Sequence, residues 1–176
     1  MPKSKRKRHP NQKGKRFIEI KKEITKNKSL TTKKILTLLN SFDNFAGCMA
    51  EDETQFLRVQ SFPSFYIINI DKSILKGSHW IAIGIFQEQI EIFDTLGFRI
   101  FNWQHVPCTL LKFLHKLSVT RKVVVSKRIQ SQNSNLCGFY CIFYILLRPS
   151  KSFNSIQSFF STNFSTNDLK LINYFN

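Results

Sequence analysis

Runs of β-branched and aromatic residues alternate along the chain with runs in which apolar residues recur at helical spacing. The strand-like runs span 64–70, 79–86, 89–95 and 121–128. Only Gln87 and Glu88 separate the second run from the third, so we expect these two strands to pair as a hairpin. The polar segment 43–56 is predicted to be a loop with a helical turn near Glu53.

Helical spacing predicts a second set of elements on both sides of these strands. The expected helices lie within 29–42, 107–117, 137–147, 155–164 and 166–175. Their candidate N-terminal residues are Ser29, Thr31 or Thr32 for the first, Pro107 for the second, and Thr166 or Asn167 for the last. The segment 137–147 is apolar on every side, which is typical of a buried helix. This order of elements predicts an α+β domain with a mainly antiparallel sheet.

Charge is concentrated at the N-terminus. Residues 1–34 hold 14 Lys and Arg against two acids, a net charge of +12 out of +16 for the whole chain. We therefore expect a basic, disordered arm over 1–28 and a single domain over 29–176. Such a basic run is typical of nuclear localisation or DNA binding, although it can also be a solvated arm without a specific partner. We expect no secretory signal and no membrane span.

Cys137 stands at the start of the predicted buried helix. Unpaired amide groups and the helix dipole stabilise a thiolate at such a position, and the amide of Cys137 itself can face a developing oxyanion. Gly138, which has no side chain, is expected to let a substrate approach the backbone. We expect free thiols at all four cysteines (Cys48, Cys108, Cys137 and Cys141), with Cys141 serving as core.

A thiol nucleophile needs a base, and His79 opens one of the two hairpin strands. If the hairpin closes with Phe86 opposite Gln87, Asp94 lies opposite His79 on the neighbouring strand. Cys137, His79 and Asp94 can then serve as nucleophile, base and orienting acid. Taken singly, each also has a structural interpretation, as a core cysteine, a polar strand residue and a turn residue.

Three blocks of the sequence carry a family resemblance. "GSHWIAIGIF", "EIFDTLGF" and "QSQNSNLCGFYC" resemble the active-site blocks of the adenovirus-type cysteine proteases, adenain, which share a clan with the SUMO proteases. The segment from "FAGCMAEDETQFL" to "PSFYIINID" is similar to adenain-like proteases of Maverick/Polinton elements and related DNA viruses. The resemblance implies a papain-like architecture whose central buried helix carries the nucleophile.

The resemblance also assigns the roles of site residues. It implies that Cys137 is the nucleophile, His79 the general base and Asp94 the acid that orients it. Gln130, seven residues before Cys137, occupies the position of the side-chain donor of the oxyanion hole, with Gln132 as the weaker alternative. No cofactor or metal is implied.

The function that the resemblance implies is a thiol endopeptidase that cleaves viral or transposon-encoded capsid or core precursors during particle maturation. The expected enzyme is a monomer in the host nucleus or the virion, holds DNA through the basic arm and is stimulated by it. Three positions depart from the patterns. Asp94 stands where the adenovirus enzyme has Glu, Val119 where it joins its activator peptide through a cysteine, and Leu136 where SUMO proteases usually have Asp. A SUMO-type deconjugating protease and a non-enzymatic DNA-binding core protein with a protease-like fold are the alternatives.

Overall fold

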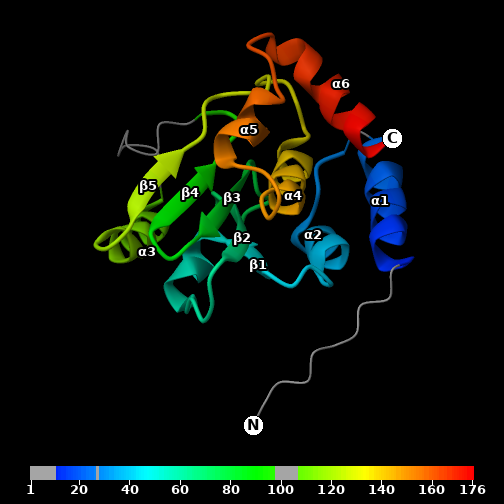
Figure 1. Cartoon of the computed structure of the whole chain (residues 1–176). Coiled ribbons are helices and arrows are strands. Elements are labelled where there is room, and N and C mark those ends of the chain that lie inside the picture. Colours follow the sequence, from blue (N-terminus) through cyan, green and yellow to red (C-terminus); the bar gives the residue numbers. More distant parts are fainter. Residues whose placement is uncertain (1–10, 27, 98–106) are drawn as a thin grey trace.

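A five-stranded sheet in the order β1-β2-β3-β4-β5 forms the centre of this computed structural model, which describes residues 11–26, 28–97 and 107–176 (Figure 1). The strands are β1 Phe45–Ala50, β2 Ser64–Asn69, β3 Trp80–Ile85, β4 Gln89–Phe93 and β5 Lys122–Val125. Pairing is antiparallel between β2, β3 and β4 but parallel for β1 with β2 and for β4 with β5. The sheet is therefore mixed, whereas the sequence predicted a mainly antiparallel one. Each parallel pair is joined by a longer connection that contains a helix, because a tight turn cannot join parallel strands.

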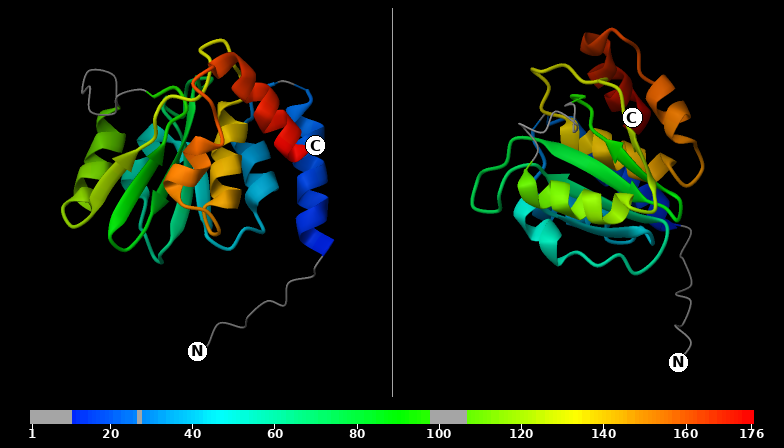
Figure 2. Two further views of the ribbon diagram at one scale, coloured as in Figure 1. Left: turned by 45° about the horizontal axis from the view of Figure 1, so that its top comes forward. Right: turned by 90° about the vertical axis from the view of Figure 1, so that its left-hand side faces the viewer.

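Helices cover both faces of this sheet (Figure 2). They are α1 Asn11–Ile24, α2 Thr32–Leu39, the 3-10 helix η1 Glu51–Phe56, α3 Cys108–Ser118, α4 Cys137–Leu147, α5 Phe153–Ser158 and α6 Phe164–Phe175. Side chains alternate across the strands, so that Phe65 and Ile67 of β2 join the core with α4, whereas Tyr66 and Ile68 join the core with α3. The result is an α+β fold with a separate apolar core on each face of the sheet.

Helix α4 is the central element of the larger core. Nine consecutive residues, Cys137 to Ile145, are buried, and α4 lies against β3. Tyr144 stacks on Phe93 of β4 with ring centroids 4.9 Å apart. The prediction of a buried helix over 137–147 is confirmed, and its start places Cys137 in the first turn.

The segment 43–56 differs from the predicted loop. Residues Phe45–Ala50 form β1 at the edge of the sheet, and only Cys48 among them is buried. An edge strand with one buried side chain lacks the apolar alternation that reveals a strand in a sequence. The helical turn near Glu53 is present as η1.

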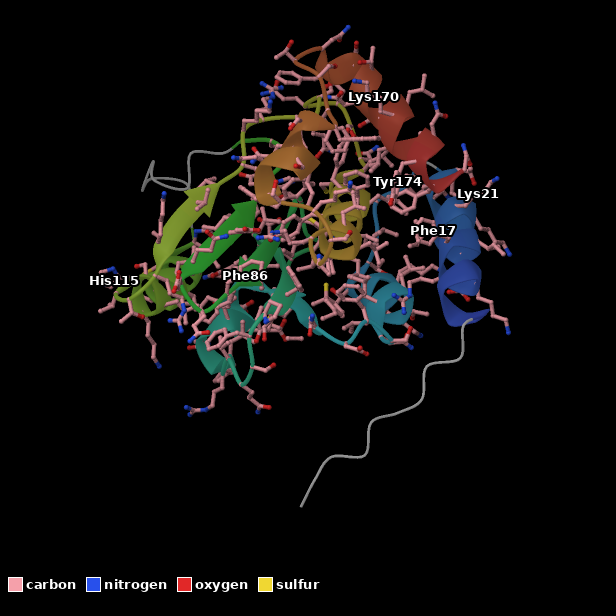
Figure 3. The ribbon with its side chains drawn as sticks, viewed as in Figure 1. Phe17, Lys21, Phe86, His115, Lys170 and Tyr174 are labelled. Carbon is pink, nitrogen blue, oxygen red and sulfur yellow. The ribbon has the colours of Figure 1, made fainter. Side chains whose placement is uncertain are left out.

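The predicted boundary between a disordered arm and a domain at residue 28 is wrong for 11–24, because these residues form helix α1. Ile20 and Ile24 are fully buried, and Phe17 contacts Tyr174 of α6 with ring centroids 6.2 Å apart (Figure 3). Residues 1–10 lie outside the described part of the chain. The spacing of Phe17, Ile20 and Ile24 is helical, a signal that the many surrounding lysines hide.

Two predictions of helix caps have opposite outcomes. Thr31, one of the three predicted candidates, caps α2 by accepting a hydrogen bond from the Lys34 amide at 3.3 Å. The N-cap of α6 is Asn163 rather than Thr166 or Asn167. None of the helices within the described ranges is long and apolar enough to cross a membrane.

Candidate active site

His79 and Asp94 meet at one end of two inner strands, where β3 begins and β4 ends. His79 Nε2 lies 2.8 Å from Asp94 Oδ1, and both side chains are buried. The predicted register of the hairpin is wrong by two residues, because Phe86 pairs with Gln89 across a two-residue turn. A shift of two keeps every side chain on its face of the sheet, so His79 and Asp94 become diagonal neighbours that still reach each other.

Backbone groups fix the Asp94 carboxylate in this position. Asp94 Oδ1 also accepts a hydrogen bond from the Leu96 amide at 3.1 Å. The Ser126 hydroxyl, which follows β5, accepts a hydrogen bond from the Asp94 amide and donates one to the Asp94 carbonyl, both at 2.8 Å. The turn closes at Gly97, whose φ of +64° favours glycine. Asp94 is therefore held from two neighbouring segments and oriented toward His79.

Cys137 lies in the first turn of α4 and hydrogen-bonds His79 through its side chain. Because Nε2 of His79 faces Asp94, Nδ1 is the ring nitrogen left for the sulfur. Burial by itself lowers the pKa of His79, but the hydrogen bonds to Asp94 and Cys137 oppose this effect, and together they raise the pKa to about 9. Within the ranges that the structure describes, no side chain caps this turn of α4. The structure thus brings the three predicted residues together as a connected set.

The role expected for Gly138 is different in the structure. A Cβ atom at this position would lie 3.2 Å from Leu30 and 3.4 Å from the Trp80 ring. The Trp80 indole Nε1 donates to the Leu30 carbonyl at 3.0 Å. Gly138 therefore makes room for packing between the segment before α2 and the tryptophan beside His79, rather than for a substrate.

A cleft of about 530 Å³ borders Cys137. Its walls come from residues 29–32 and from the β2–β3 connection, including 71–73 and 75–78, and Trp80 also lines it. Asn69 and Glu53 also line the cleft, so polar and apolar groups are mixed. Cys137 thus lies at the wall of a cleft that is lined by both polar and apolar side chains.

Gln130 and Gln132 occupy different environments. Gln130 is 1% exposed, and its side-chain amide donates to the carbonyl and the hydroxyl of Ser134 at 3.1 and 2.9 Å. Gln132 is exposed. The buried Gln130 amide therefore has a defined orientation toward Ser134, three residues before Cys137.

The remaining cysteines and histidines do not join this site. Cys48 and Cys141 are buried in the core, where burial raises the pKa of both thiols, and Cys108 is exposed. His115 lies on α3, on the opposite face of the sheet from α4 (Figure 3). His9 and His105 lie outside the described residues. All four cysteines are free, as predicted.

Comparisons of the chain with known proteins identify its fold. No family model and no curated protein matches the sequence. The solved structure of the ASFV pS273R protease matches with a TM-score of 0.51 and 19% identity, covering 85% of this chain and 67% of that chain. The fold is that of the CE-clan cysteine proteases. The SUMO protease Ulp1 has a TM-score of 0.35 and 14% identity, covering 90% of this chain and 71% of its own. HopZ1a has a TM-score of 0.43 and 12% identity, with coverages of 85% and 63%.

The papain-like α+β architecture predicted from the sequence is thus confirmed. Sequence reasoning missed several residues that hold the site together, among them Ser126 behind Asp94 and Leu30 beside Gly138. No local pattern marks either residue, since each acts through a contact with a segment far along the chain.

Proposed function

We propose that the protein is an adenain-like thiol endopeptidase in which Cys137 is the nucleophile. The observation that carries this proposal is the connected set of Asp94, His79 and Cys137 beside an open cleft. A buried histidine bonded on one side to a carboxylate and on the other to a thiol at a helix start has the arrangement that activates a cysteine.

The geometry supports a two-step mechanism. His79 takes the proton of Cys137, and the thiolate attacks the scissile carbonyl. Asp94 keeps His79 in the tautomer that accepts this proton and stabilises the imidazolium that forms. The Cys137 amide and Gln130 stabilise the tetrahedral oxyanion. His79 then protonates the leaving amine, and water hydrolyses the thioester to release the acid and restore the thiol.

The substrates that we propose are viral or transposon-encoded capsid or core precursors, cleaved during particle maturation in the host nucleus or the virion. The cleft beside Cys137 suits an extended segment of chain. Exposed lysines on α1, including Lys15 and Lys22, extend the basic N-terminal sequence. We propose that this surface holds the enzyme on DNA, where precursors are concentrated.

Alkylation with iodoacetamide between pH 5 and 9, read for each cysteine by peptide mass spectrometry, tests the nucleophile. Cys137 is expected to react below pH 7, where an ordinary thiol of pKa roughly 8.5 is scarcely ionised. The exposed Cys108 is the internal reference. His79→Ala is expected to remove the faster alkylation of Cys137 relative to Cys108. Equal rates for Cys137 and Cys108 at every pH would overturn the proposal and favour a non-enzymatic DNA-binding protein.

Two further experiments test the substrate class. Particles that carry Cys137→Ala should retain uncleaved precursors, and an unchanged precursor profile would contradict the maturation role. A SUMO-type modifier with a C-terminal electrophile should leave Cys137 unlabelled. Rapid labelling by that probe would instead identify a deconjugating protease.

DNA binding is tested by its salt dependence. Affinity for duplex DNA should fall steeply between about 50 and 200 mM salt, because each phosphate contact releases a counterion. Replacing Lys15 and Lys22 by Gln should reduce the slope of log affinity against log salt by up to about 2. The matched control replaces Lys112 and Lys116, which are exposed on α3. A flat salt dependence would remove DNA as a partner.

A further inference from the structure

The segment that joins β5 to α4 is held by the C-terminal helix α6. Asn167 of α6 is fully buried and donates to the Ile129 carbonyl at 2.7 Å. The next residue, Asp168, accepts a hydrogen bond from the Ser134 hydroxyl at 3.0 Å. Two neighbouring residues of α6 thus bind both ends of the stretch 129–134, which contains Gln130.

Ser134 connects Asp168 to Gln130. Its hydroxyl oxygen accepts from Gln130 Nε2 at 2.9 Å and from the Leu136 amide at 3.2 Å, while its proton goes to Asp168. A hydroxyl has one proton and two lone pairs, so all three positions are used. Because Asp168 takes the proton, Ser134 can only accept from Gln130.

The other end of the Gln130 amide is also fixed. The Thr95 hydroxyl donates to Gln130 Oε1, and Thr95 directly follows Asp94. With a donor at Oε1 and an acceptor at Nε2, only one orientation of the amide satisfies both partners. The N–H groups of Gln130 therefore face Ser134, whose hydroxyl and carbonyl both accept from Nε2, three residues before Cys137.

Asp168 also contacts the nucleophile helix directly. The Tyr140 hydroxyl, one turn after Cys137, donates to the same Oδ1 of Asp168 at 2.9 Å. Burial and the nearby Asp168 charge raise the pKa of Tyr140, which keeps it protonated as a donor. One carboxylate oxygen thus ties the first turn of α4 to the segment that carries Gln130.

We propose that Asp168 is a positioning residue that, through Ser134, sets the orientation of Gln130 relative to Cys137. This inference rests on the proposed function, since it assigns Asp168 a role in the oxyanion site. Without Asp168, the Ser134 proton must find another acceptor and the hydroxyl rotates, which removes the defined acceptor for Gln130. The hydrogen bond between His79 and Asp94 does not involve Asp168, although Asp168 also holds α4 through Tyr140.

Two reactions of Cys137 distinguish a change in the oxyanion site from a change in the reactivity of the thiol. Acylation by p-nitrophenyl acetate passes through a tetrahedral oxyanion, with the thiolate attacking the carbonyl and p-nitrophenolate leaving. Alkylation by iodoacetamide displaces iodide directly and forms no oxyanion. Both rates are measured on the full chain in a Cys108→Ser background, which removes the exposed competing thiol.

Gln130→Ala is expected to slow acylation by about 100-fold or more, the effect of removing one oxyanion donor. Asp168→Ala and Ser134→Ala should slow acylation by about 10-fold or more, consistent with a partial loss of the same donor. Alkylation should change by less than about twofold in all three variants, because the hydrogen bond between His79 and Asp94 stays in place. Combining Ser134→Ala with Gln130→Ala should add little to the loss caused by Gln130→Ala alone.

Matched controls are Ser165→Ala on α6 and Ser150→Ala after α4, both exposed serines. Asp168→Asn preserves shape, and its thermal unfolding shows whether a loss reflects folding. Wild-type acylation rates in Asp168→Ala, Asp168→Asn and Ser134→Ala would overturn the inference alone. An equal loss of acylation and alkylation would also overturn it, because that indicates a structural role. A wild-type Cys137 that is acylated no faster than Cys108 in the unmodified chain would overturn the proposed function and this inference with it.

Discussion

Arg148 and Glu91 form a bidentate ion pair at the C-terminal end of α4, whereas Cys137 lies at the N-terminal end. Arg148 Nε lies 2.7 Å from Oε2 of Glu91, and Nη2 lies 2.8 Å from Oε1. The Tyr144 hydroxyl donates to the same carboxylate at 2.7 Å. Glu91 is fully buried on β4, the strand that ends at Asp94. The pair therefore fixes the nucleophile helix against the strand that positions the orienting acid.

Arg148→Met should destabilise the protein by about 3–5 kcal/mol, because it leaves the buried Glu91 carboxylate without its charged partner. The free energy of unfolding in urea measures this effect. Arg58→Met, at an exposed arginine, is the control and should change stability by less than about 0.5 kcal/mol. The double change with Glu91→Gln should recover part of the loss. An Arg148→Met variant as stable as the wild type would show that the pair contributes little.

Helix α1 should contribute to the stability of the domain. Ile20→Ala is expected to lower the free energy of unfolding by about 2–4 kcal/mol, because the Ile20 side chain is fully buried where α1 packs on the core. Ile18 lies on the same helix and is 67% exposed, so Ile18→Ala is the matched control with an expected change below about 0.5 kcal/mol. Equal, small effects in thermal or urea unfolding would mean that α1 is not packed as the structure shows.

The raised pKa of His79 predicts a pH-dependent stability. A histidine whose pKa rises from 6.5 to about 9 on folding stabilises the protein fully below pH 6.5 and loses this contribution as the pH rises through 9. The difference in free energy of unfolding between the wild type and His79→Gln should therefore be largest near pH 6 and smallest above pH 9.

The matched control is His115→Gln, at the exposed histidine of α3. NMR titration of labelled histidines gives a second measurement of the same effect. Cys137→Ala should lower the pKa of His79, because the contacts with Cys137 contribute to raising it. A wild-type advantage over His79→Gln that stays constant from pH 6 to 9 would contradict the assignment.

Gly97→Ala should disturb the turn that holds Asp94. Its φ of +64° costs a residue with a side chain about 1–2 kcal/mol, and the new Cβ would lie 2.8 Å from Arg128 Cβ. We expect lower stability and slower alkylation of Cys137 together. Gly14→Ala on α1, where a new Cβ would meet no described atom within 4 Å beyond its own turn of helix, should instead stabilise the protein by up to about 1 kcal/mol. Unchanged stability in Gly97→Ala would show that the turn adapts.

Local patterns in the sequence predicted much of the fold because those segments satisfy their own spacing rules. Runs of β-branched and aromatic residues predicted β2 and β3, polar and apolar alternation predicted β4, and continuous apolar character predicted α4. The edge strand β1 and the lysine-rich helix α1 were missed, since each buries few side chains. The hydrophobic pattern by which a sequence reveals a helix or strand is therefore weak in both elements.

The residues of the candidate site and the proximity of His79 to Asp94 were predicted from the sequence, whereas the contacts that fix them were not. The sequence by itself determined that His79, Asp94 and Cys137 stand at the ends of a strand, a strand and a helix, because element ends follow local patterns. Only the tertiary structure decided the hairpin register, the reason for Gly138 and the link from Asp168 to Gln130. These features depend on contacts between residues up to 108 positions apart, as between Leu30 and Gly138. Spacing along a chain reports on neighbours within a few residues, whereas side-chain packing and hydrogen bonding between distant segments exist only once the chain has folded.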